Sequence, residues 1–550
     1  MAKALNLALA QPEFRLGDLS FQVEQVVTLA KQAAQQGAEV VVFPELWLPG
    51  YPALDLLYRA DLQPRVEGAI AQIARELQDV CAVLIGYPRP ADQGFVGQSS
   101  PDGGARPSLY NCLGLIGDGQ VLGEHRKRAL PNYEVFDERR YFQPGASATV
   151  IPYRGVNLGL LACEDVWVPQ GVDETIEAGA ELLLVANASP YHRGKWAERQ
   201  TRLSDIARTH QTPVLYTNAV GGQDDLVFDG DAQAYNSAGE LVARAPLFEP
   251  SLLMCQFQDD VLMGSEVAPA PNPWGEVYEA LVLATRDYIQ KNGFPGVILG
   301  LSGGIDSALT LAIAVDALGP EAVTAVMMPY HYTADISKDD AAEQALAQGV
   351  EYRVAPIIEP VEALKAQILP ILGDRSLGTT LENLQSRSRG VILMGLSNAT
   401  GRLVLTTGNK SELAVGYATL YGDMAGGYNV LRDVPKTWVF ALSEYRNSIG
   451  PVIPQRVIDR PPSAELAPDQ VDTDSLPDYP VLDDILERYL SAHESPEQII
   501  AAGHSADTVK RVVRLVNIAE YKRRQGAVGP RITPNSFNQD RRVPITQRWH

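Results

Sequence analysis

The sequence is poor in cysteine and histidine, and it contains no long apolar run. Only four of its 550 residues are cysteine, no CxxC spacing occurs, and the seven histidines are scattered. This usage excludes a disulfide framework and is untypical of a zinc site, so we expect no zinc, haem or flavin. No stretch of about 18 apolar residues is present, so we expect no membrane span and no membrane partner.

Positive charge is also scarce. Lysine and arginine number 46 against 67 acidic residues, which gives a net charge of -21. A nucleic-acid surface normally needs clustered lysine and arginine, so we expect no nucleic-acid partner. We interpret the basic run at residues 522–524 as a local phosphate-facing or solvated patch. The N-terminal apolar stretch is shorter than that of a signal peptide, which predicts a cytoplasmic location.

The length and the alternation of elements predict two α/β domains. A chain of 550 residues exceeds what one hydrophobic core usually holds. We place the first domain at residues 1–250, a partly proline-rich linker at residues 251–275, and the second domain at residues 276–550. In the first domain we expect strands at residues 39–43, 81–86, 157–162, 182–186 and 213–217.

Two local patterns in the first domain predict a helix and a hairpin. Ser20 can cap a helix whose Val23, Val26 and Val27 share one face, and Gly37 suits its end. The string GDGQVLG at residues 117–123 follows a strand but precedes HRKR, so we expect a hairpin turn there.

The second domain shows the pattern of a doubly wound parallel sheet. A buried strand at residues 297–301 is followed by a glycine turn and a helix beginning near Ala308, and residues 323–330 predict the next strand. Residues 459–479 are rich in proline and acidic residues, and we expect a long loop there.

Three strings of the first domain each place a reactive side chain just after a strand. FPELWLPGY contains Glu45, KRALPNYEVFDERR contains Lys127, and LACEDVWVP contains Cys163. Alone, a cysteine here is usually a buried small apolar residue and a glutamate a solvated cap. Together they supply what amide hydrolysis needs: a thiol nucleophile, a base for its proton, and a fixed positive charge for the oxyanion.

These strings resemble the nitrilase superfamily, whose members carry Glu, Lys and Cys in this order, over roughly residues 4–245. The resemblance implies a four-layer αββα sandwich and a catalytic triad of Glu45, Lys127 and Cys163. The glutaminase branch of the family implies glutamine-binding positions at Tyr51, Tyr133, Trp167, Ser189 and Lys195. Glu134 departs from the family, which usually has a small residue there.

The string SGGIDS at residues 302–307 lies between a strand and a helix. Glycine lets the backbone approach an anion, and the free amides of a helix N-terminus attract negative charge, so we expect a phosphate site. The string is neither a Walker A loop nor GxGxxG. A glycine-rich tight turn is the alternative.

SGGIDS resembles the pyrophosphate-binding loop of the ATP pyrophosphatase class, which has a Rossmann-like sheet. ENLQSRSRG, GNKSE followed by GDMAGG, and RPPSAELAPDQ are similar to NAD synthetases over most of residues 276–545. The resemblance implies Mg²⁺ ligands at Asp306 and Glu412. It implies ATP contacts at Ser302, Gly303, Gly304, Ile305, Asp306, Ser307, Arg387 and Thr407. It implies contacts with deamido-NAD at Glu382, Asn383, Asp423, Lys436 and Lys522.

Two features of this half leave alternatives open. Surface charge is the other explanation for Asp423, Lys436 and Lys522. In MMPYHYTAD, Tyr330 and His331 stand where the family commonly has serine and arginine, which puts ATP contacts at that strand end in question.

The two resemblances together imply a glutamine-hydrolysing NAD synthetase family. We expect deamido-NAD, ATP and L-glutamine as substrates, a homo-oligomeric assembly, and a sheltered passage for ammonia, because ammonium cannot attack an acyl group. One alternative is another amidotransferase of the same loop class, acting on a different carboxylate or carbonyl. The other is a regulatory protein whose first domain senses glutamine.

Overall fold

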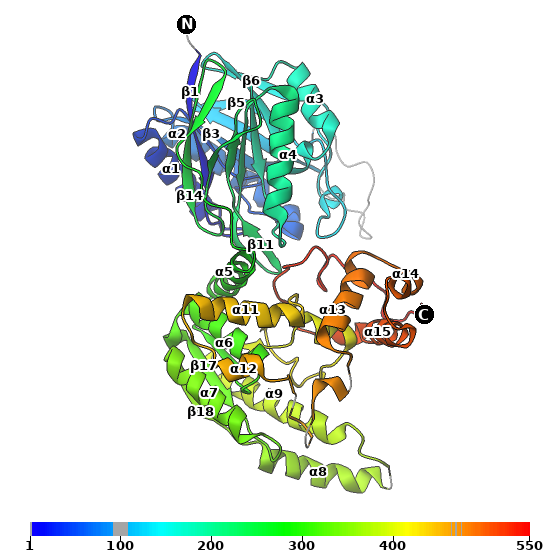
Figure 1. Cartoon of the computed structure of the whole chain (residues 1–550). Helices are drawn as coiled ribbons and strands as arrows, with labels where there is room; N and C mark the ends of the chain where they lie inside the picture. The colour runs from blue at the N-terminus through cyan, green and yellow to red at the C-terminus, as the bar shows by residue number, and fades with distance from the viewer. Residues whose placement is uncertain are drawn as a thin grey trace. The chain divides into compact units, whose positions relative to one another are not determined.

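The computed structural model describes residues 3–91, 108–373, 375–463, 465–467, 470–474 and 476–549. They divide into two compact units (Figure 1): Met1–Gly221 with Phe228–Pro271, and Gly222–Val227 with Asn272–His550. Within the described ranges, none of the helices has both the length and the apolar character that crossing a bilayer requires.

The first unit contains two sheets packed face to face. One has the strand order β15 (Val261–Gly264), β14 (Ser251–Gln258), β1 (Ala4–Gln11), β2 (Val40–Val42), β3 (Ala82–Pro90), β4 (Leu109–Gly117) and β5 (Gln120–Arg126). The other has the order β13 (Leu241–Arg244), β12 (Gln233–Tyr235), β9 (Val214–Asn218), β8 (Leu182–Asn187), β7 (Val156–Ala162) and β6 (Thr149–Tyr153). One apolar cluster, which includes Leu7, Leu84, Leu160 and Leu184, joins their inner faces. A short hairpin, β10 (Val220–Gln223) and β11 (Leu226–Asp229), follows β9.

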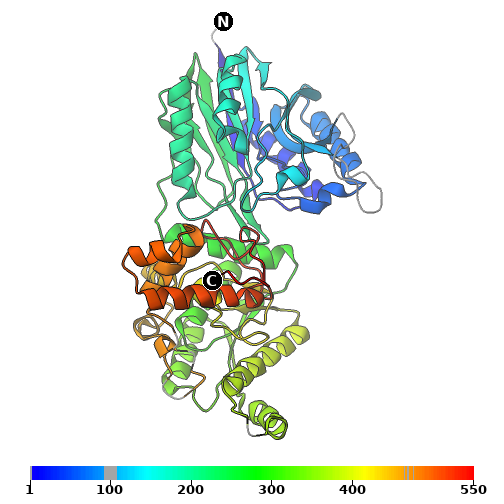
Figure 2. The same ribbon diagram turned by 90° about the vertical axis from the view of Figure 1, so that its right-hand side faces the viewer.

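Helices cover the outer faces of both sheets. Figures 1 and 2 show α1 (Leu19–Gln35) and α2 (Leu62–Glu76) on one side of the strands, and α3 (Pro169–Glu177) and α4 (Lys195–His210) on the other. The second pair packs on its sheet through Val172 and Leu203. The expected αββα sandwich is therefore present.

Three local expectations for this unit can be compared with the structure. Asp18, not Ser20, caps the first helix: its Oδ1 accepts from the Phe21 amide over 3.1 Å, because the helix begins one residue before Ser20. Gly37 follows the helix with φ +94°, as expected. Asp118 and Gly119, with φ of +50° and +76°, connect β4 and β5 in the expected hairpin.

Residues 251–264 do not form a linker. They form β14 and β15, and β14 pairs antiparallel with the whole of β1, from Ala4 opposite Gln258 to Gln11 opposite Ser251. Leu253, Cys255 and Phe257 alternate along β14 and are buried. Because alternate residues of a strand face the same side, this segment completes the core of the first unit.

The second unit is built on a parallel sheet. Its order is β18 (Glu351–Val354), β17 (Val323–Met327), β16 (Val297–Gly300), β19 (Leu403–Thr406) and β20 (Tyr428–Asn429), and neighbouring strands run parallel. The chain runs from β16 outward to β18 and then returns to the other side of β16. The strand order therefore reverses between β16 and β19, the place where open α/β sheets bind ligands.

Helices lie on both faces of this sheet. Ile298 of β16 packs with Leu384 and Leu393 of α9 (Thr380–Thr400). Its neighbours Val297 and Leu299 point to the opposite face, where α6 (Ile305–Leu318) contacts β16. The remaining helices are α5 (Gly275–Lys291), α7 (Asp335–Gln348), α8 (Ile358–Leu372), α10 (Lys410–Val415), α11 (Lys436–Ile449), α12 (Gln455–Asp459), α13 (Tyr479–Leu486), α14 (Pro496–Ala501), α15 (Ala506–Ile518) and α16 (Glu520–Arg523).

Candidate active sites

In the first unit, Glu45 and Lys127 form a buried ion pair. Glu45 lies just after β2, and Lys127 directly follows β5. The ammonium of Lys127 lies 2.7 Å from Oε1 of Glu45, and neither side chain is accessible to solvent. Asn111 donates to the same oxygen over 2.7 Å, and the Ala188 amide donates to Oε2 over 3.3 Å. Burial lowers the pKa of Lys127, but the nearby carboxylates raise it well above its usual value, so the lysine stays charged.

Cys163 occupies the turn that follows β7. The residue is buried, and its φ of +43° lies in the left-handed region that non-glycine residues rarely adopt. Burial raises the pKa of the Cys163 thiol well above its usual value, the Glu45 charge adds to this, and Lys127 opposes it. The resting group is therefore a thiol, and it needs a base before it can attack.

Glu138 is a fourth charged residue of this site, and the sequence analysis did not single it out. It accepts from Lys127 over 2.8 Å and from the hydroxyl of Tyr51 over 3.0 Å. Burial raises the pKa of Glu138 to about 7, Lys127 opposes this, and the Glu45 charge adds to it. Its only signal in the sequence was its place in the same string as Lys127.

The other residues expected to bind glutamine lie on several elements. The hydroxyl of Tyr133, whose residue is 51% exposed, donates to Glu164 over 2.9 Å. Both residues line a cavity of about 530 Å³. The ammonium of Lys195 lies 4.6 Å from the centre of the Trp167 ring. Glu164, directly after Cys163, is a further residue that the sequence analysis did not select.

Ser189 belongs to a buried polar network. Arg199 donates to the Ser189 carbonyl over 3.0 Å and to its hydroxyl over 3.2 Å. The same guanidinium contacts both oxygens of Asp229 at 2.7 Å. Asn218 accepts from the Ser189 amide over 2.8 Å. The position of Ser189 is thus fixed by groups that solvent does not reach.

In the second unit, the SGGIDS string forms the turn between β16 and α6. The hydroxyls of Ser302 and Ser307 lie 3.0 Å apart, and the Ser302 amide donates to Ser307 Oγ over 3.2 Å. Gly303 has a φ of +82°, and a Cβ there would lie 2.2 Å from the Ser337 carbonyl oxygen. Only glycine fits this position, and the turn leads into the N-terminus of α6 as a phosphate loop does.

Two carboxylates meet around one lysine beside this turn. Lys436 donates to Oδ2 of Asp306 and lies 3.3 Å from Oε1 of Glu412. Asn409 donates to Oδ1 of Asp306 over 2.9 Å. Burial raises the pKa of Glu412 to about 8. Burial lowers the pKa of Lys436, but Asp306 and Glu412 together raise it above its usual value.

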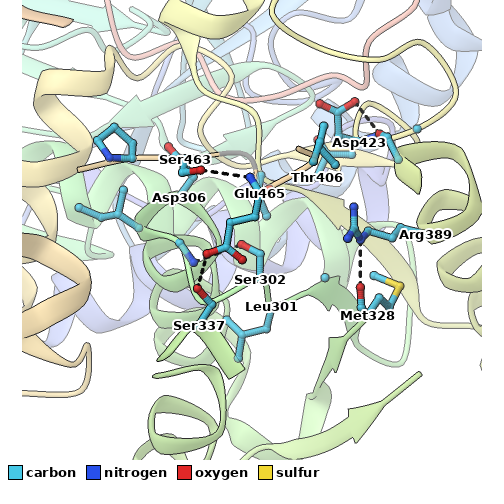
Figure 3. Close-up of a pocket in the computed structure, with 18 of the residues that line it drawn as sticks. Leu301, Ser302, Asp306, Met328, Ser337, Arg389, Thr406, Asp423, Ser463 and Glu465 are labelled. Atoms are coloured by element: carbon cyan, nitrogen blue, oxygen red, sulfur yellow. Dashed lines mark hydrogen bonds between the residues drawn. The ribbon is translucent and has the colours of Figure 1, made fainter. Parts of the chain in front are cut away.

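A cavity of about 300 Å³ lies at the carboxyl ends of β16, β17 and β19. Figure 3 shows residues that line it, including Ser302, Asp306, Arg389 and Asp423. Of the residues expected from the sequence, those that line the cavity are Ser302, Gly304, Ile305, Asp306, Thr407, Glu412, Asp423 and Lys436. Those outside its lining are Gly303, Ser307, Glu382, Asn383, Arg387 and Lys522.

Several of these residues have partners near the cavity. Asp423 accepts from the Thr419 amide over 2.6 Å and from the Ser386 hydroxyl over 3.2 Å. Asn383 accepts from the hydroxyl of Thr419 over 3.0 Å. Lys522 donates to two backbone carbonyls, and burial lowers its pKa although Asp423 opposes this. The contacts of Ser386 with Asp423 and of Asn383 with Thr419 join α9 to the segment that follows α10.

The cavity also contains charged residues that the sequence analysis did not select. Arg389 donates to the Met328 carbonyl over 3.1 Å, and burial lowers its pKa to about 10. Glu465 accepts from Ser337 over 2.6 Å, and Arg460 donates to the Gly303 carbonyl over 2.5 Å. Arg460 and Glu465 lie on the expected long loop, which runs beside the SGGIDS turn (Figure 3).

Tyr330, one of the two residues after β17 that depart from the family pattern, does not line the cavity. Its hydroxyl donates to Glu362 over 2.7 Å, and neither Tyr330 nor His331 lines the cavity. Its neighbours Met328 and Thr333 do. The unusual pair therefore leaves the described lining of the cavity unchanged.

Comparisons with known proteins cover both units. The carbon-nitrogen hydrolase family matches residues 6–262, and the NAD synthase family matches residues 277–526. The glutamine-dependent NAD(+) synthetase of Acinetobacter baylyi is 48% identical, and the alignment covers 100% of this chain and 99% of that protein.

Solved structures agree over the full length. The glutamine-dependent NAD+ synthetase of Acinetobacter baumannii, solved with adenosine diphosphate, matches with a TM-score of 0.79 and 46% identity. It covers 100% of this chain and 99% of that one. The enzyme from Cytophaga hutchinsonii, with a TM-score of 0.82 at 22% identity over 99% of this chain and 98% of that one, shows the likeness of fold. The chain belongs to the family of glutamine-dependent NAD+ synthetases.

Proposed function

We propose that this enzyme converts deamido-NAD to NAD+ with ATP and with ammonia released from glutamine. It is a ligase that forms a C–N bond, and its products are NAD+, AMP, pyrophosphate and glutamate. The observation that carries the proposal is the presence of two different sites in one chain. One is a buried thiol beside a Glu–Lys pair, and the other is a glycine turn beside two carboxylates and a lysine.

We assign glutamine hydrolysis to the first unit. Glu45 takes the proton of the Cys163 thiol as the sulfur attacks the amide carbon. The oxyanion that forms is stabilised by the charge of Lys127, which a dry site makes effective. The C–N bond then breaks, Glu45 returns the proton to the leaving nitrogen, and ammonia departs. Water attacks the thioester and releases glutamate and the thiol.

We assign glutamine recognition in this unit to residues near Cys163. We propose that Tyr51, Tyr133, Trp167, Ser189 and Lys195 hold the substrate. The Glu164 carboxylate and the Lys195 ammonium provide charges of opposite sign for the ammonium and carboxylate of an amino acid. Their location on separate elements supports recognition of both ends of one small molecule.

We assign amide formation to the cavity of the second unit. An oxygen of the nicotinate carboxylate attacks the α-phosphorus of ATP, the bond to the bridging oxygen breaks, and pyrophosphate leaves. The nitrogen of ammonia then attacks the acyl carbon, AMP leaves, and a proton is lost. The SGGIDS turn with Thr407 and Arg387 holds ATP, and Asp423, Lys436, Lys522, Glu382 and Asn383 hold deamido-NAD.

The residues around Lys436 fit a magnesium ion. Mg²⁺ is usually held by one or two carboxylates together with substrate phosphates and water. Asp306 and Glu412 provide two carboxylates beside the glycine turn, and Lys436 neutralises them in part. When bound, the ion would neutralise charge on the phosphates, while Lys436 would be released to contact a phosphate oxygen.

Three further parts of the proposal concern the whole protein. We set the boundary between the glutaminase and the ligase after β15, near residue 271. We propose a homo-oligomer, as the family resemblance implies. We propose a cytoplasmic location, which the four unpaired cysteines support because thiols persist in a reducing compartment.

A labelling experiment tests the proposed function. The full chain is supplied with deamido-NAD, ATP, Mg²⁺ and glutamine labelled on its amide nitrogen. We expect the label in the carboxamide of NAD+, with one AMP formed per NAD+. Unlabelled product, ADP in place of AMP, or faster amidation of another acyl acceptor would contradict the proposal.

A further inference from the structure

Asp165, two residues after Cys163, has a buried carboxylate that no step above uses. It lies in the short 3-10 turn Cys163–Val166. Its Oδ2 accepts from the Ala162 amide over 3.0 Å and lies 2.9 Å from Nε2 of His125. The side chains of Asp165 and His125 are both inaccessible to solvent, and the oxygens of the carboxylate are occupied by donors of the protein itself.

The hydrogen bond from the Ala162 amide to Asp165 closes a turn of the backbone around Cys163. Ala162 precedes Cys163, so the bond from its amide to Asp165 spans the residue whose φ is +43°. A non-glycine residue holds such a conformation only where its surroundings fix it. The Asp165 carboxylate is one of the groups that fix it here.

The other oxygen of Asp165 holds the segment that carries Lys127. Oδ1 accepts from the amide of Arg128 over 3.1 Å and from the amide of Ala129 over 2.8 Å. These two residues directly follow Lys127. One carboxylate therefore ties the backbone before the nucleophile to the backbone after the lysine, although Arg128 and Asp165 are 37 residues apart in the sequence.

The carboxylate is charged in this position. Burial alone would raise the pKa of Asp165, but the hydrogen bond and charge of His125 and the amides of Ala129 and Ala162 outweigh it and lower the pKa. An ionised carboxylate has only acceptor oxygens, which suits four donors. Hydrogen bonds to a charged acceptor are also stronger than neutral ones.

We propose that Asp165 is a positioning residue for amide hydrolysis, which sets the separation of Cys163 from Lys127 by holding both backbone segments. The inference rests on the glutaminase assignment above. Its consequence is a specific pattern of kinetic change. Loss of the tie should slow the chemical step and leave glutamine binding almost unchanged, because none of the four donors to Asp165 is a residue proposed to bind glutamine.

The variant Asp165→Asn tests this in the full chain. The amide can still accept from Arg128 and Ala129, but its NH₂ group would face the Ala162 amide, a donor against a donor. We expect the glutaminase kcat to fall by about 100-fold, the effect of a small misplacement of reacting groups. We expect the KM for glutamine to stay within about threefold and ammonia-dependent NAD+ formation to be unchanged.

A matched control is the pair of exposed Asp173 and half-buried His210, which lie 3.4 Å apart in the same unit. Asp173→Asn should leave both activities unchanged. A purely structural role for Asp165 would lower the melting temperature while kcat per folded site stayed at the wild-type value, and that result would overturn the proposal. A kcat for Asp165→Asn within threefold of wild type would overturn it as well.

If Asp165→Asn does not fold, hydrogen exchange of the wild-type chain tests whether Asp165 holds the two backbone segments. The amides of Arg128, Ala129 and Ala162 should exchange as slowly as the amides inside β7. Fast exchange at these positions would show that the tie does not persist in solution. If the wild-type chain itself releases no glutamate from glutamine, the proposed function fails. If the wild type is active and Asp165→Asn has the same kcat, only this inference fails.

Discussion

Lys127 lies 2.8 Å from Glu138, almost as close as it lies to Glu45 at 2.7 Å. One ammonium therefore holds two buried carboxylates that would otherwise repel each other. Because burial and the Glu45 charge raise the pKa of Glu138 to about 7 against the effect of Lys127, its charge changes in the working pH range. The site thus contains a titrating group next to the proposed base.

We predict that this group shapes the pH profile of glutamine hydrolysis. An ionised Glu138 accepts from the Lys127 ammonium and the Tyr51 hydroxyl more strongly than a neutral one does, and so holds both groups in place beside Glu45. The glutaminase kcat should therefore rise as the pH increases through about 7. Glu138→Gln should lower kcat by roughly 10-fold to 100-fold and remove this rise. Glutamate release measured from pH 5.5 to 9 checks it, and an unchanged inflection in the variant would contradict it.

The second prediction separates the two activities. Cys163→Ala should abolish NAD+ formation from glutamine but leave formation from added ammonia, because the thiol serves only the amidase. Cys112→Ala is the matched control, since Cys112 is also a buried free cysteine of the first unit. It should retain both activities. Loss of ammonia-dependent synthesis in Cys163→Ala would show that the sites are not separate.

The third prediction concerns the carboxylates of the ligase. Asp306→Ala removes the partner of Lys436 beside the glycine turn. We expect NAD+ formation to fall by about 1000-fold or more with either nitrogen source, while glutamine hydrolysis continues. Asp316→Ala, on the same helix but bonded to Arg446 and Tyr278, should retain ligase activity. Normal ligase turnover in Asp306→Ala would remove Asp306 from the site.

The sequence predicted the residues that directly follow strands better than those on loops and helices. Glu45, Lys127 and Cys163 each follow closely after a strand, and a strand pattern places such residues. Glu138 lies in a 3-10 turn within a loop, where no periodicity indicates which side chain turns inward. The linker was misplaced because residues 251–258 pair with β1, a contact of residues about 250 positions apart that no local pattern reveals.

Two arginines of α9 show again what a local sequence pattern cannot predict. Arg387 and Arg389 are two positions apart, so they point about 200° apart around the helix. The resemblance selected Arg387, which donates to the Leu420 carbonyl, whereas Arg389 lines the cavity. Only the register of the helix against the sheet decides which arginine lines the cavity.

The fourth prediction follows from the position of Arg389. Arg389 is half-buried, and its pKa is lowered to about 10 because burial outweighs the carboxylates near it. An anionic substrate in the cavity would add negative charge beside the guanidinium. Arg389→Gln should raise the KM for ATP or deamido-NAD by about 10-fold or more. Arg353→Gln, an exposed arginine of β18, is the control. Unchanged KM values for both substrates in Arg389→Gln would contradict the prediction.

The last prediction concerns stability. Asp225 of the second unit is 5% exposed, and burial raises its pKa to about 6. A folded pKa above the unfolded value of about 3.9 means that the stabilising contribution is complete at low pH and is lost as the pH rises through 6. The total loss is about 3 kcal/mol, and about 1.4 kcal/mol of it falls between pH 5 and pH 8.

Asp225→Asn cannot ionise, so it should not lose this contribution. Relative to the wild type, the variant should therefore gain stability between pH 5 and pH 8, and calorimetry of the second unit's transition at both pH values measures the gain. Asp224→Asn, at the exposed neighbouring residue, should show no such difference. A gap between Asp225→Asn and the wild type that stays constant with pH would mean that the buried carboxylate keeps its ordinary pKa.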